Sequence, residues 1–386
     1  MVRLVIPQAT HPPQPTAPAG TDRRRRYLPV LGWFLGIRLF GVATLAVWSW
    51  INGKSAYVLL SARWDSLWYV RVVQQGYGFV EATKDGRHLS DMAFFPLYPL
   101  LEKCFSVLLF TTPANAGLLV SLGGSLFAAA GIFALVETFL GTRVGFLTAL
   151  LWGALPVSVV ESMAYTESLF VALAAWSLWC LQREHWPAAG LLAAAAGLTS
   201  PAGVAVALAV WWAVGCDIRT NGWHRRGVVG LLLAPAGLGG YVLWVGWRTG
   251  SLFGYMGVQK AWGNGFDAGI GFARFTFGLM SGWGILAGIA LCAGVALLIR
   301  CYLLGFRRHY PIALQVYTGV VLVLVLGASG YFGSKPRLLL PAFGLLIPAA
   351  TRLAAAQKRT VWSVVAVLCV ISAAYGAFWL NGSGPP

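Results

Sequence analysis

The sequence predicts an all-α protein that crosses a membrane many times, as a bundle of about eleven transmembrane helices. Three observations predict this fold class. Of the 386 residues, 58% are hydrophobic and 10% are charged, whereas soluble domains contain about 25% charged residues. Apolar stretches of roughly 20 residues, long enough to cross the hydrocarbon layer, recur between Tyr27 and Leu380. The 47 glycines and 18 tryptophans are typical of close helix packing in lipid and of membrane interfaces.

The chain is expected to hold one transmembrane domain, residues 27–380, between two short tails. Residues 1–26 are rich in Pro, Ala and Thr and end in four arginines, which favours a disordered cytoplasmic tail. The apolar run 27–51 is longer than that of a cleaved signal peptide and is predicted to be the first span. Residues 381–386 form a short outer tail.

A long first outer loop, residues 52–110, is predicted to follow the first span. Its first part, 52–91, is polar and holds four of the 12 acidic residues. Residues 93–110 are apolar, but two prolines and the pair Glu102–Lys103 interrupt them. We therefore expect a helix lying in the membrane interface rather than another span.

The remaining spans follow at regular intervals, and their charges set the orientation. They are predicted at 114–140, 144–160, 168–182, 187–198, 201–215, 228–247, 274–298, 311–330, 338–354 and 361–380. With the N-terminus in the cytoplasm, 16 of the 28 basic residues lie in short inner segments, as the positive-inside rule requires. The same topology places 8 of the 12 acidic residues on the outer face. An active site is therefore expected on the outer face, in the manner of a bacterial plasma-membrane enzyme.

Composition also excludes other classes of site. The net charge of +16 is spread over loops between apolar spans, which argues against a nucleic-acid partner. The six cysteines form no CxxC pair, and the five histidines are scattered. No metal site is predicted from this pattern, although a divalent ion stays compatible with the chemistry below.

The first outer loop contains the strongest candidate for a catalytic residue, Asp65. Arg63, Trp64, Trp68 and Tyr69 surround it in sequence, and helical spacing places Trp64 and Trp68 on one face. A carboxylate among indole rings suits a general base that deprotonates a sugar hydroxyl, and the rings suit a sugar or an isoprenoid. The alternative is an interfacial helix with a tryptophan belt and one solvated aspartate.

A second candidate element, at a predicted outer turn, contains Tyr165 and Glu167. Carboxylates at span ends without an obligatory partner are candidates for function. The alternative is that Thr166 or Ser168 simply caps the next helix.

Three cations could meet a phosphate group. Lys335 and Arg337 lie together beside a predicted helix start, and Lys260 follows Gln259 in another outer segment. The alternative is that all three are ordinary basic loop residues. Arg38, deep in the first span, needs a partner, and Glu137 is the expected one in a structural ion pair.

These elements, in this order, resemble the PIG-V family of mannosyltransferases, which add the second mannose of glycosylphosphatidylinositol in eukaryotes and have bacterial relatives. The resemblance runs from Arg38 to about Ala350. The matching segments are Arg38 in the first span, Arg63-Trp64-Asp65, Gly76-Tyr77, Ala93-Phe94-Phe95-Pro96-Leu97-Tyr98-Pro99-Leu100-Leu101, Tyr165-Thr166-Glu167-Ser168-Leu169-Phe170, Lys335-Pro336-Arg337 and Leu340-Pro341-Ala342-Phe343.

The resemblance implies a glycosyltransferase of the GT-C type, with a polyprenyl-phosphate sugar as donor and a glycolipid or glycan as acceptor. It nominates Asp65 as the base, and Glu167 and Arg337 as residues that contact donor or acceptor. Two departures bear on the donor. Thr199-Ser200-Pro201 stands where relatives usually carry an arginine, and Leu338 stands where a tyrosine often follows Arg337.

The expected reaction is one inverting displacement, with Asp65 as base. Lys335, Arg337 and Lys260 would hold the leaving polyprenyl phosphate, while Arg63, Trp64, Trp68, Tyr69, Tyr165, Glu167 and Gln259 would contact donor or acceptor. No cofactor is expected beyond the lipid-linked donor, expected to carry mannose. Two alternatives come from other classes: a non-catalytic membrane subunit of a glycosylation complex, and a lipid or sugar transporter, which the lack of an internal repeat disfavours.

Overall fold

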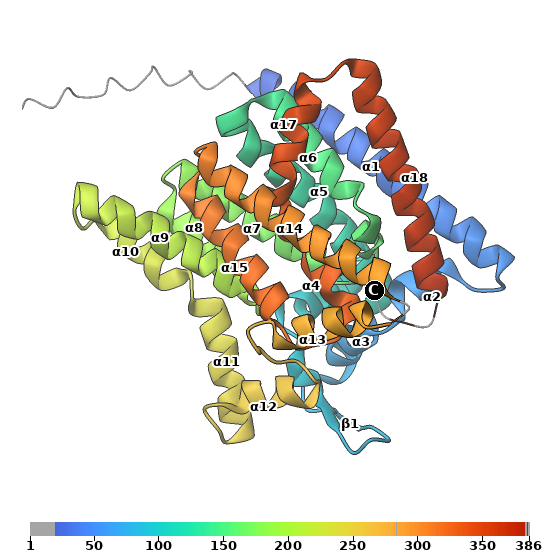
Figure 1. Ribbon diagram of the computed structural model, residues 1–386. Coiled ribbons are helices and arrows are strands. Elements are labelled where there is room, and N and C mark those ends of the chain that lie inside the picture. The colour runs from blue at the N-terminus through green and yellow to red at the C-terminus, as the bar shows by residue number, and fades with distance from the viewer. Residues whose placement is uncertain (1–19, 283, 383, 385–386) are drawn as a thin grey trace, which may run out of the picture.

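A computed structural model describes residues 20–282, 284–382 and 384, so most of the expected N-terminal tail lies outside the described residues. The chain folds as a bundle of helices with one small hairpin (Figure 1). The helices are α1 (Gly20–Ile51), α2 (Ala56–Ser61), α3 (Asp65–Gln75), α4 (Leu97–Leu108), α5 (Pro113–Leu140), α6 (Thr142–Gly153), α7 (Glu167–Gln182), α8 (Trp186–Gly197), α9 (Gly203–Asn221), α10 (Arg225–Leu233), α11 (Ala236–Thr249), α12 (Gly254–Ala261), α13 (Ile270–Met280), α14 (Ile285–Arg307), α15 (Ile312–Gly327), α16 (Lys335–Leu338), α17 (Ile347–Ala355) and α18 (Lys358–Asn381).

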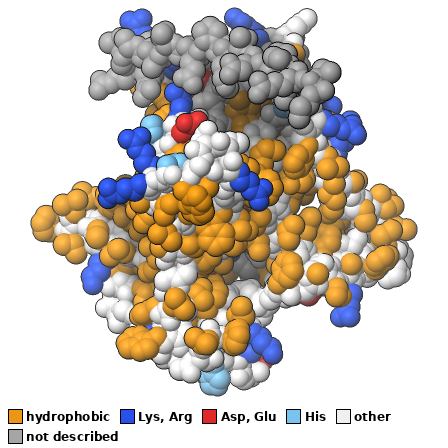
Figure 2. All heavy atoms as spheres, turned by 90° about the vertical axis from the view of Figure 1, so that its left-hand side faces the viewer, with side chains coloured by type: hydrophobic (Ala, Val, Ile, Leu, Met, Phe, Trp, Pro, Cys, Tyr) orange, Lys and Arg blue, Asp and Glu red, His pale blue; other side chains and the backbone are white. Residues whose placement is uncertain are grey.

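The described residues form six helices long and apolar enough to cross a membrane, or eight if two sharply bent pairs each make one span. The six are α1, α5, α9, α10 with α11, α14 and α18. Four further apolar helices, α7, α8, α13 and α15, are shorter. Figure 2 shows broad hydrophobic areas on one flank of the bundle, as expected where side chains face lipid. The chain is a multi-pass membrane protein, and the total of eleven spans stays a prediction.

Proline and glycine break several of the predicted spans. The expected span 144–160 is α6 followed, after a bend of 84°, by the short 3₁₀ helix η2 (Pro156–Ser162). The expected span 338–354 is the 3₁₀ helix η4 (Phe343–Leu346) joined to α17, and a bend of 74° separates this pair from the segment 332–338. The expected span 274–298 is divided between α13 and α14, because Gly282 and Gly284 weaken the helix between them.

The first loop folds against one end of the bundle. Strands β1 (Val80–Ala82) and β2 (His88–Ser90) form an antiparallel hairpin, which the sequence reading did not predict. The short helices η1 (Asp91–Ala93) and α4 follow, so the helix expected within 93–110 is present. Trp262, next to α12, donates its indole N–H to the carbonyl of Ser90 at 3.0 Å, and this bond attaches the hairpin to α12 at the same end of the molecule (Figure 1).

Close packing of α5 against α7 fixes the relative position of these two helices behind the first loop. A Cβ added at Gly124 of α5 would lie 3.0 Å from the backbone nitrogen of Leu169, and one added at Gly131 would lie 3.0 Å from the Ala175 side chain. Only glycine allows this approach of the two backbones. Because α7 begins at Glu167, the packing also fixes the position of that carboxylate.

Arg38 of α1 holds the bend between α6 and η2. Its guanidinium donates to the carbonyls of Gly153 and Ser158, and to the Ser158 hydroxyl at 2.7 Å. Glu161 Oε2 lies 3.7 Å from Arg38 Nη1. A bend inside a membrane leaves backbone carbonyls without helical partners, and Arg38 satisfies two of them.

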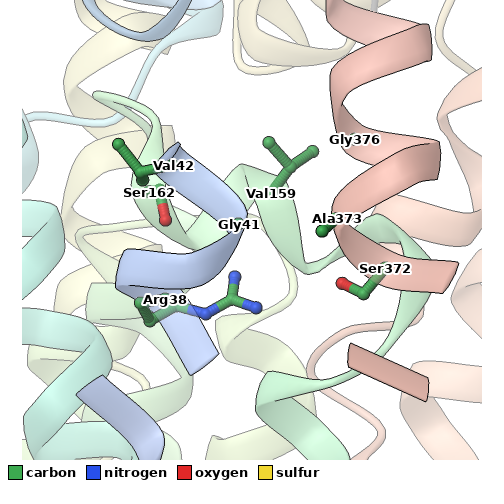
Figure 3. Close-up of a pocket in the computed structure, with 8 residues that line it drawn as sticks. All are labelled: Arg38, Gly41, Val42, Val159, Ser162, Ser372, Ala373 and Gly376. Atoms are coloured by element: carbon green, nitrogen blue, oxygen red, sulfur yellow. The ribbon is translucent and has the colours of Figure 1, made fainter. Parts of the chain in front are cut away.

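The prediction of an ion pair between Arg38 and Glu137 is therefore wrong. Glu137 instead pairs with Arg26, whose Nη1 lies 3.4 Å from Glu137 Oε1. Figure 3 shows why Arg38 cannot take that role: its guanidinium extends toward Ser372 of α18, beside a cavity of about 10 Å³. The sequence indicated that Arg38 needed a partner, but the identity of that partner depends on the bend at Pro156.

Candidate active site

Three charged side chains from distant parts of the chain meet at the end of the bundle that carries the first loop. Arg337 Nη1 donates to Asp65 Oδ2 at 2.9 Å, and Arg337 Nε lies 3.1 Å from Glu167 Oε1. The side chains of Arg337 and Glu167 are 14% and 11% exposed, and that of Asp65 is 27% exposed. Asp65 is thus the member of this triad most open to a ligand.

Local structure explains the position of each member of the triad. Asp65 is the first residue of α3, after Trp64, whose backbone takes a positive φ of 51°. Glu167 is the first residue of α7, where the helix dipole favours a carboxylate. Arg337 lies in the short helix α16, which Pro336 helps to start.

Two tyrosines line the triad. The Tyr165 hydroxyl accepts a hydrogen bond from the Asp65 backbone N–H at 3.3 Å, and the Arg337 guanidinium lies 5.1 Å from the centre of the Tyr165 ring. Tyr69 is buried one helical turn after Asp65. Burial, followed by the negative charge of Asp65, raises the pKa of Tyr69 well above its usual value. Both tyrosines are therefore neutral supports for the triad.

A buried polar layer lies behind Tyr165. Ser121 of α5 donates to the Tyr165 carbonyl at 3.0 Å and accepts from the Tyr165 backbone N–H at 3.2 Å. The Tyr98 hydroxyl lies 2.8 Å from the Ser121 hydroxyl and donates to the Gly117 carbonyl at 2.9 Å. This layer connects α4 and α5 to the segment that carries Tyr165.

Glu102 of α4 is buried beside this layer, and neither of its carboxyl oxygens has a hydrogen-bond partner among the described residues. A Cβ added at Gly117 would lie 2.2 Å from Glu102 Oε1, so glycine makes room for the carboxyl group. Burial raises the pKa of Glu102 to about 9. Its place beside Tyr98 was missed from the sequence, although the charged pair Glu102–Lys103 inside an apolar run was the signal that could have found it.

Lys335 is buried, and its ammonium group is engaged within the protein. Nζ donates to the carbonyls of Val325 at 2.8 Å and Ala328 at 2.7 Å, and it lies 5.6 Å from the centre of the Phe272 ring. These bonds connect the end of α15 to α16. Lys335 thus holds the helix that presents Arg337.

Arg63 also binds backbone. It donates to the carbonyls of Leu380 at 2.6 Å and Gly382 at 3.0 Å, and its guanidinium lies 4.0 Å from the centre of a Trp64 ring. The segment just before Asp65 is therefore held by the end of α18.

The remaining predicted residues form an aromatic wall and a polar edge near α12. Trp68 stacks on Phe94 with ring centres 5.5 Å apart and meets Trp262 edge-on at 4.9 Å. The Gln259 amide donates to the Tyr255 hydroxyl at 2.8 Å. Lys260 is exposed and makes no hydrogen bond or ion pair with the described part of the chain.

The structure thus brings five predicted residues together: Asp65, Tyr69, Tyr165, Glu167 and Arg337. Trp68, Gln259 and Lys260 belong to the neighbouring wall, and Lys335, Arg63 and Trp64 hold the surrounding backbone. Within residues 20–282, 284–382 and 384, no three His, Cys, Asp or Glu side chains cluster as metal ligands would.

Comparisons with solved structures show the fold. The chain is similar to ArnT from Cupriavidus metallidurans bound to undecaprenyl phosphate, with a TM-score of 0.55 and 15% identity over 89% of this chain and 64% of that one. It is also similar to the archaeal oligosaccharyltransferase AglB from Archaeoglobus fulgidus, in complex with an inhibitory peptide and a dolichol-phosphate. That match has a TM-score of 0.52 and 10% identity over 95% of this chain and 57% of that one.

The chain therefore spans less than two thirds of the length of either structure. The predicted fold class, a helical membrane bundle of the GT-C type, is confirmed. No family model and no curated protein matches the sequence.

Proposed function

We propose that this chain is a glycosyltransferase that moves a sugar from a polyprenyl-phosphate carrier to an acceptor hydroxyl at the outer face of the membrane. The observation that carries the proposal is the triad of Asp65, Arg337 and Glu167 on a GT-C-type bundle. Of the two solved structures described above, that of ArnT contains undecaprenyl phosphate and that of AglB a dolichol-phosphate. A lipid-linked donor also suits a site built between membrane helices.

Asp65 is the proposed general base. Oδ2 accepts from Arg337, and no described residue donates a hydrogen bond to Oδ1. Oδ1 is thus available to an acceptor hydroxyl. As that hydroxyl oxygen forms its bond to the anomeric carbon, its proton passes to Asp65 and the bond from the anomeric carbon to the phosphate oxygen breaks. The bonding electrons leave with the polyprenyl phosphate, and the single displacement inverts the anomeric centre.

Arg337 is the proposed partner of the leaving phosphate. Its Nη1 contacts Asp65 and its Nε lies beside Glu167, whereas Nη2 has no hydrogen-bond partner among the described residues. A guanidinium can therefore hold the base with one edge and a phosphate oxygen with the other. Lys335, two residues before Arg337, adds positive charge near the site, although its ammonium group donates to the carbonyls of Val325 and Ala328. Lys260 is free to approach a phosphate from the α12 side.

The aromatic residues supply surfaces for the sugar and the isoprenoid. Trp64 and Trp68 flank Asp65 in sequence, and Tyr69 and Tyr165 line the triad. Flat rings bind the apolar faces of sugars and prenyl units. Glu167 places a carboxylate beside these rings, and Arg63 and Gln259, which already bind protein groups, border the same surface. Mannose is the donor sugar that the PIG-V resemblance suggests, and a glycolipid or glycan is the corresponding acceptor.

The test is transfer of radiolabelled mannose from polyprenyl-phosphate-mannose to membrane glycolipids, in membranes that contain wild-type protein or Asp65→Asn. Asp85→Asn is a matched control, because Asp85 is an exposed acid of the same loop that pairs with Arg87. Transfer by wild type and the control alone supports the enzyme and its base. Equal transfer by all three overturns Asp65 as base. Absence of transfer by folded wild type, across several donors and acceptors, overturns the proposed activity.

A parallel assay in chelator, with and without added Mg²⁺ or Mn²⁺, tests the metal question. Loss of transfer in chelator that the added ion restores would show that the reaction depends on a divalent metal.

A further inference from the structure

A large apolar groove lies between α1 and α18, away from the candidate active site. It encloses about 480 Å³, within the range of about 300–1,000 Å³ that holds small ligands. Its walls are Trp33, Gly36, Ile37, Phe40, Trp362, Val365, Ala366 and Cys369. The side chains of Trp33 and Phe40 are about half exposed, so the groove opens at the surface of the bundle.

The position of the groove within the membrane favours a hydrocarbon ligand. Both walls belong to helices long and apolar enough to cross the membrane, α1 from Arg25 to Ile51 and α18 from Lys358 to Asn381. An apolar opening at this depth faces lipid chains rather than water. The small cavity beside Arg38 lies farther along the same two helices, where Gly41 of α1 and Ser372 and Gly376 of α18 line it (Figure 3).

Trp33 and Trp362 mark the end of the groove nearest to the starts of both helices. Their rings lie 4.4 Å apart between centres. Lining residues advance together along the two helices, from Trp33 to Phe40 and from Trp362 to Cys369. Tryptophan pairs of this kind favour the level of the lipid headgroups.

Basic side chains lie just beyond this tryptophan pair. Lys358 and Arg359 precede Trp362 by four and three residues, so helical spacing places them on the same face of α18 as that ring. Arg25 of α1 lies two turns before Trp33. All three are exposed, and none forms an ion pair with a described carboxylate. An apolar groove thus ends in uncompensated positive charge at headgroup level.

We propose that the groove between α1 and α18 binds one anionic phospholipid. One of its acyl chains lies along Gly36, Phe40 and Ala366, and its negatively charged headgroup lies beside Lys358, Arg359 and Arg25. Clusters of lysine and arginine next to a membrane span recognise anionic lipids in this way. The topology predicted from charge places the site in the cytoplasmic leaflet, on the opposite side from the proposed active site.

The proposal is tested by titrating the purified full-length protein with phosphatidylglycerol or phosphatidylcholine of identical acyl chains, with lipid adducts counted by native mass spectrometry. Two variants address the two parts of the site. Lys358→Gln with Arg359→Gln removes headgroup charge. Gly36→Leu fills the groove, since a Cβ added at Gly36 meets no atom within 4 Å.

Each variant has a matched control on α14. Arg307→Gln with Arg308→Gln removes a basic pair at the end of another span, and Gly294→Leu adds a side chain where a Cβ also meets no atom within 4 Å. Ala366→Leu replaces Gly36→Leu if that variant does not fold.

Wild type is expected to bind phosphatidylglycerol roughly 100-fold tighter than phosphatidylcholine, since each of the three nearby cations adds about a fivefold preference. The double charge variant, which keeps Arg25, should retain only about a fivefold preference. Gly36→Leu should lose binding of both lipids, while both controls should bind lipids as wild type does. Equal affinity of wild type for the two lipids overturns the headgroup assignment. Equal lipid binding by Gly36→Leu, Ala366→Leu and Gly294→Leu overturns the proposal that the groove is the binding site.

Discussion

Asp65 Oδ2 and Arg337 Nη1 lie 2.9 Å apart, although 272 residues separate them in the sequence. The same guanidinium lies 3.1 Å from Glu167, so one cation is shared by two carboxylates. The shared guanidinium orients the Asp65 carboxylate and leaves its Oδ1 available to a ligand.

Replacing Asp65 with Asn removes the proposed base with little change in shape. The turnover number should fall by about 10²–10⁴, the usual contribution of a general base, while donor KM changes little. Initial rates at saturating acceptor measure the change. A comparable fall in the turnover number of Asp85→Asn would show that the loss does not depend on which acid of the loop is replaced. It would contradict the assignment of Asp65 as a specific base.

Replacing Arg337 with Gln leaves two carboxylates close together without a shared cation. Loss of one partner from a buried ion pair costs about 3–5 kcal/mol of folding free energy, so the thermal midpoint should fall by several degrees. Adding Glu167→Gln should recover part of this loss but no transfer activity. Recovery of activity in the double variant would contradict a role for Arg337 at the phosphate.

Replacing Arg38 with Lys keeps the charge but loses the planar group that reaches Gly153 and Ser158 together. The bend between α6 and η2 should loosen, and the segment that carries Tyr165 and Glu167 should move with it. We expect a lower thermal midpoint and a lower turnover number. Arg26→Gln, which breaks the other ion pair of α1, is the control and should lower stability without a selective loss of turnover.

Glu102 should make stability depend on pH. The pKa of Glu102 is about 9 in the folded protein and about 4.5 for the free side chain. The folded state therefore keeps a proton that the unfolded chain releases, and stability falls as pH rises from about 4.5 to about 9. Glu102→Gln should remove the part of this pH dependence that comes from Glu102. The thermal midpoint of the variant should therefore be higher than that of wild type at pH 8 and equal to it near pH 4.5. Parallel pH profiles for the two proteins would contradict the assignment.

Composition and local pattern were enough to predict the helical bundle. Long apolar runs such as α5 and α18 lie within one to three residues of their predicted bounds, because such a run in lipid has few alternatives to a helix. The bends were missed, since Pro156 ends one helix in the middle of an apolar run that hydropathy alone reads as continuous. The hairpin of β1 and β2 was missed because its strands are only three residues each and none of those residues is buried, so they show no alternating pattern of apolar side chains.

The candidate site was predictable in its residues but not in its geometry. A carboxylate among indole rings indicated Asp65, a carboxylate at a span end indicated Glu167, and a basic turn indicated Arg337. Local sequence cannot show that Lys335 faces the carbonyls of Val325 and Ala328 whereas Arg337, two residues later, faces Asp65. That difference depends on the short helix α16 and on the end of α15.

The triad also has a consequence for how the protein is made. A chain synthesised at about 5–20 residues per second needs roughly 10–50 s to extend from Asp65 to Arg337. During that interval Glu167 has entered the membrane region, and its cationic partner has not yet been translated. The nascent chain must therefore keep this carboxylate protonated, hydrated or shielded by the insertion machinery until α16 arrives. Maturation of the site is thus among the last steps of biogenesis, and ribosome-stalled chains that end before Arg337 should be captured by the insertion machinery in an incompletely assembled form.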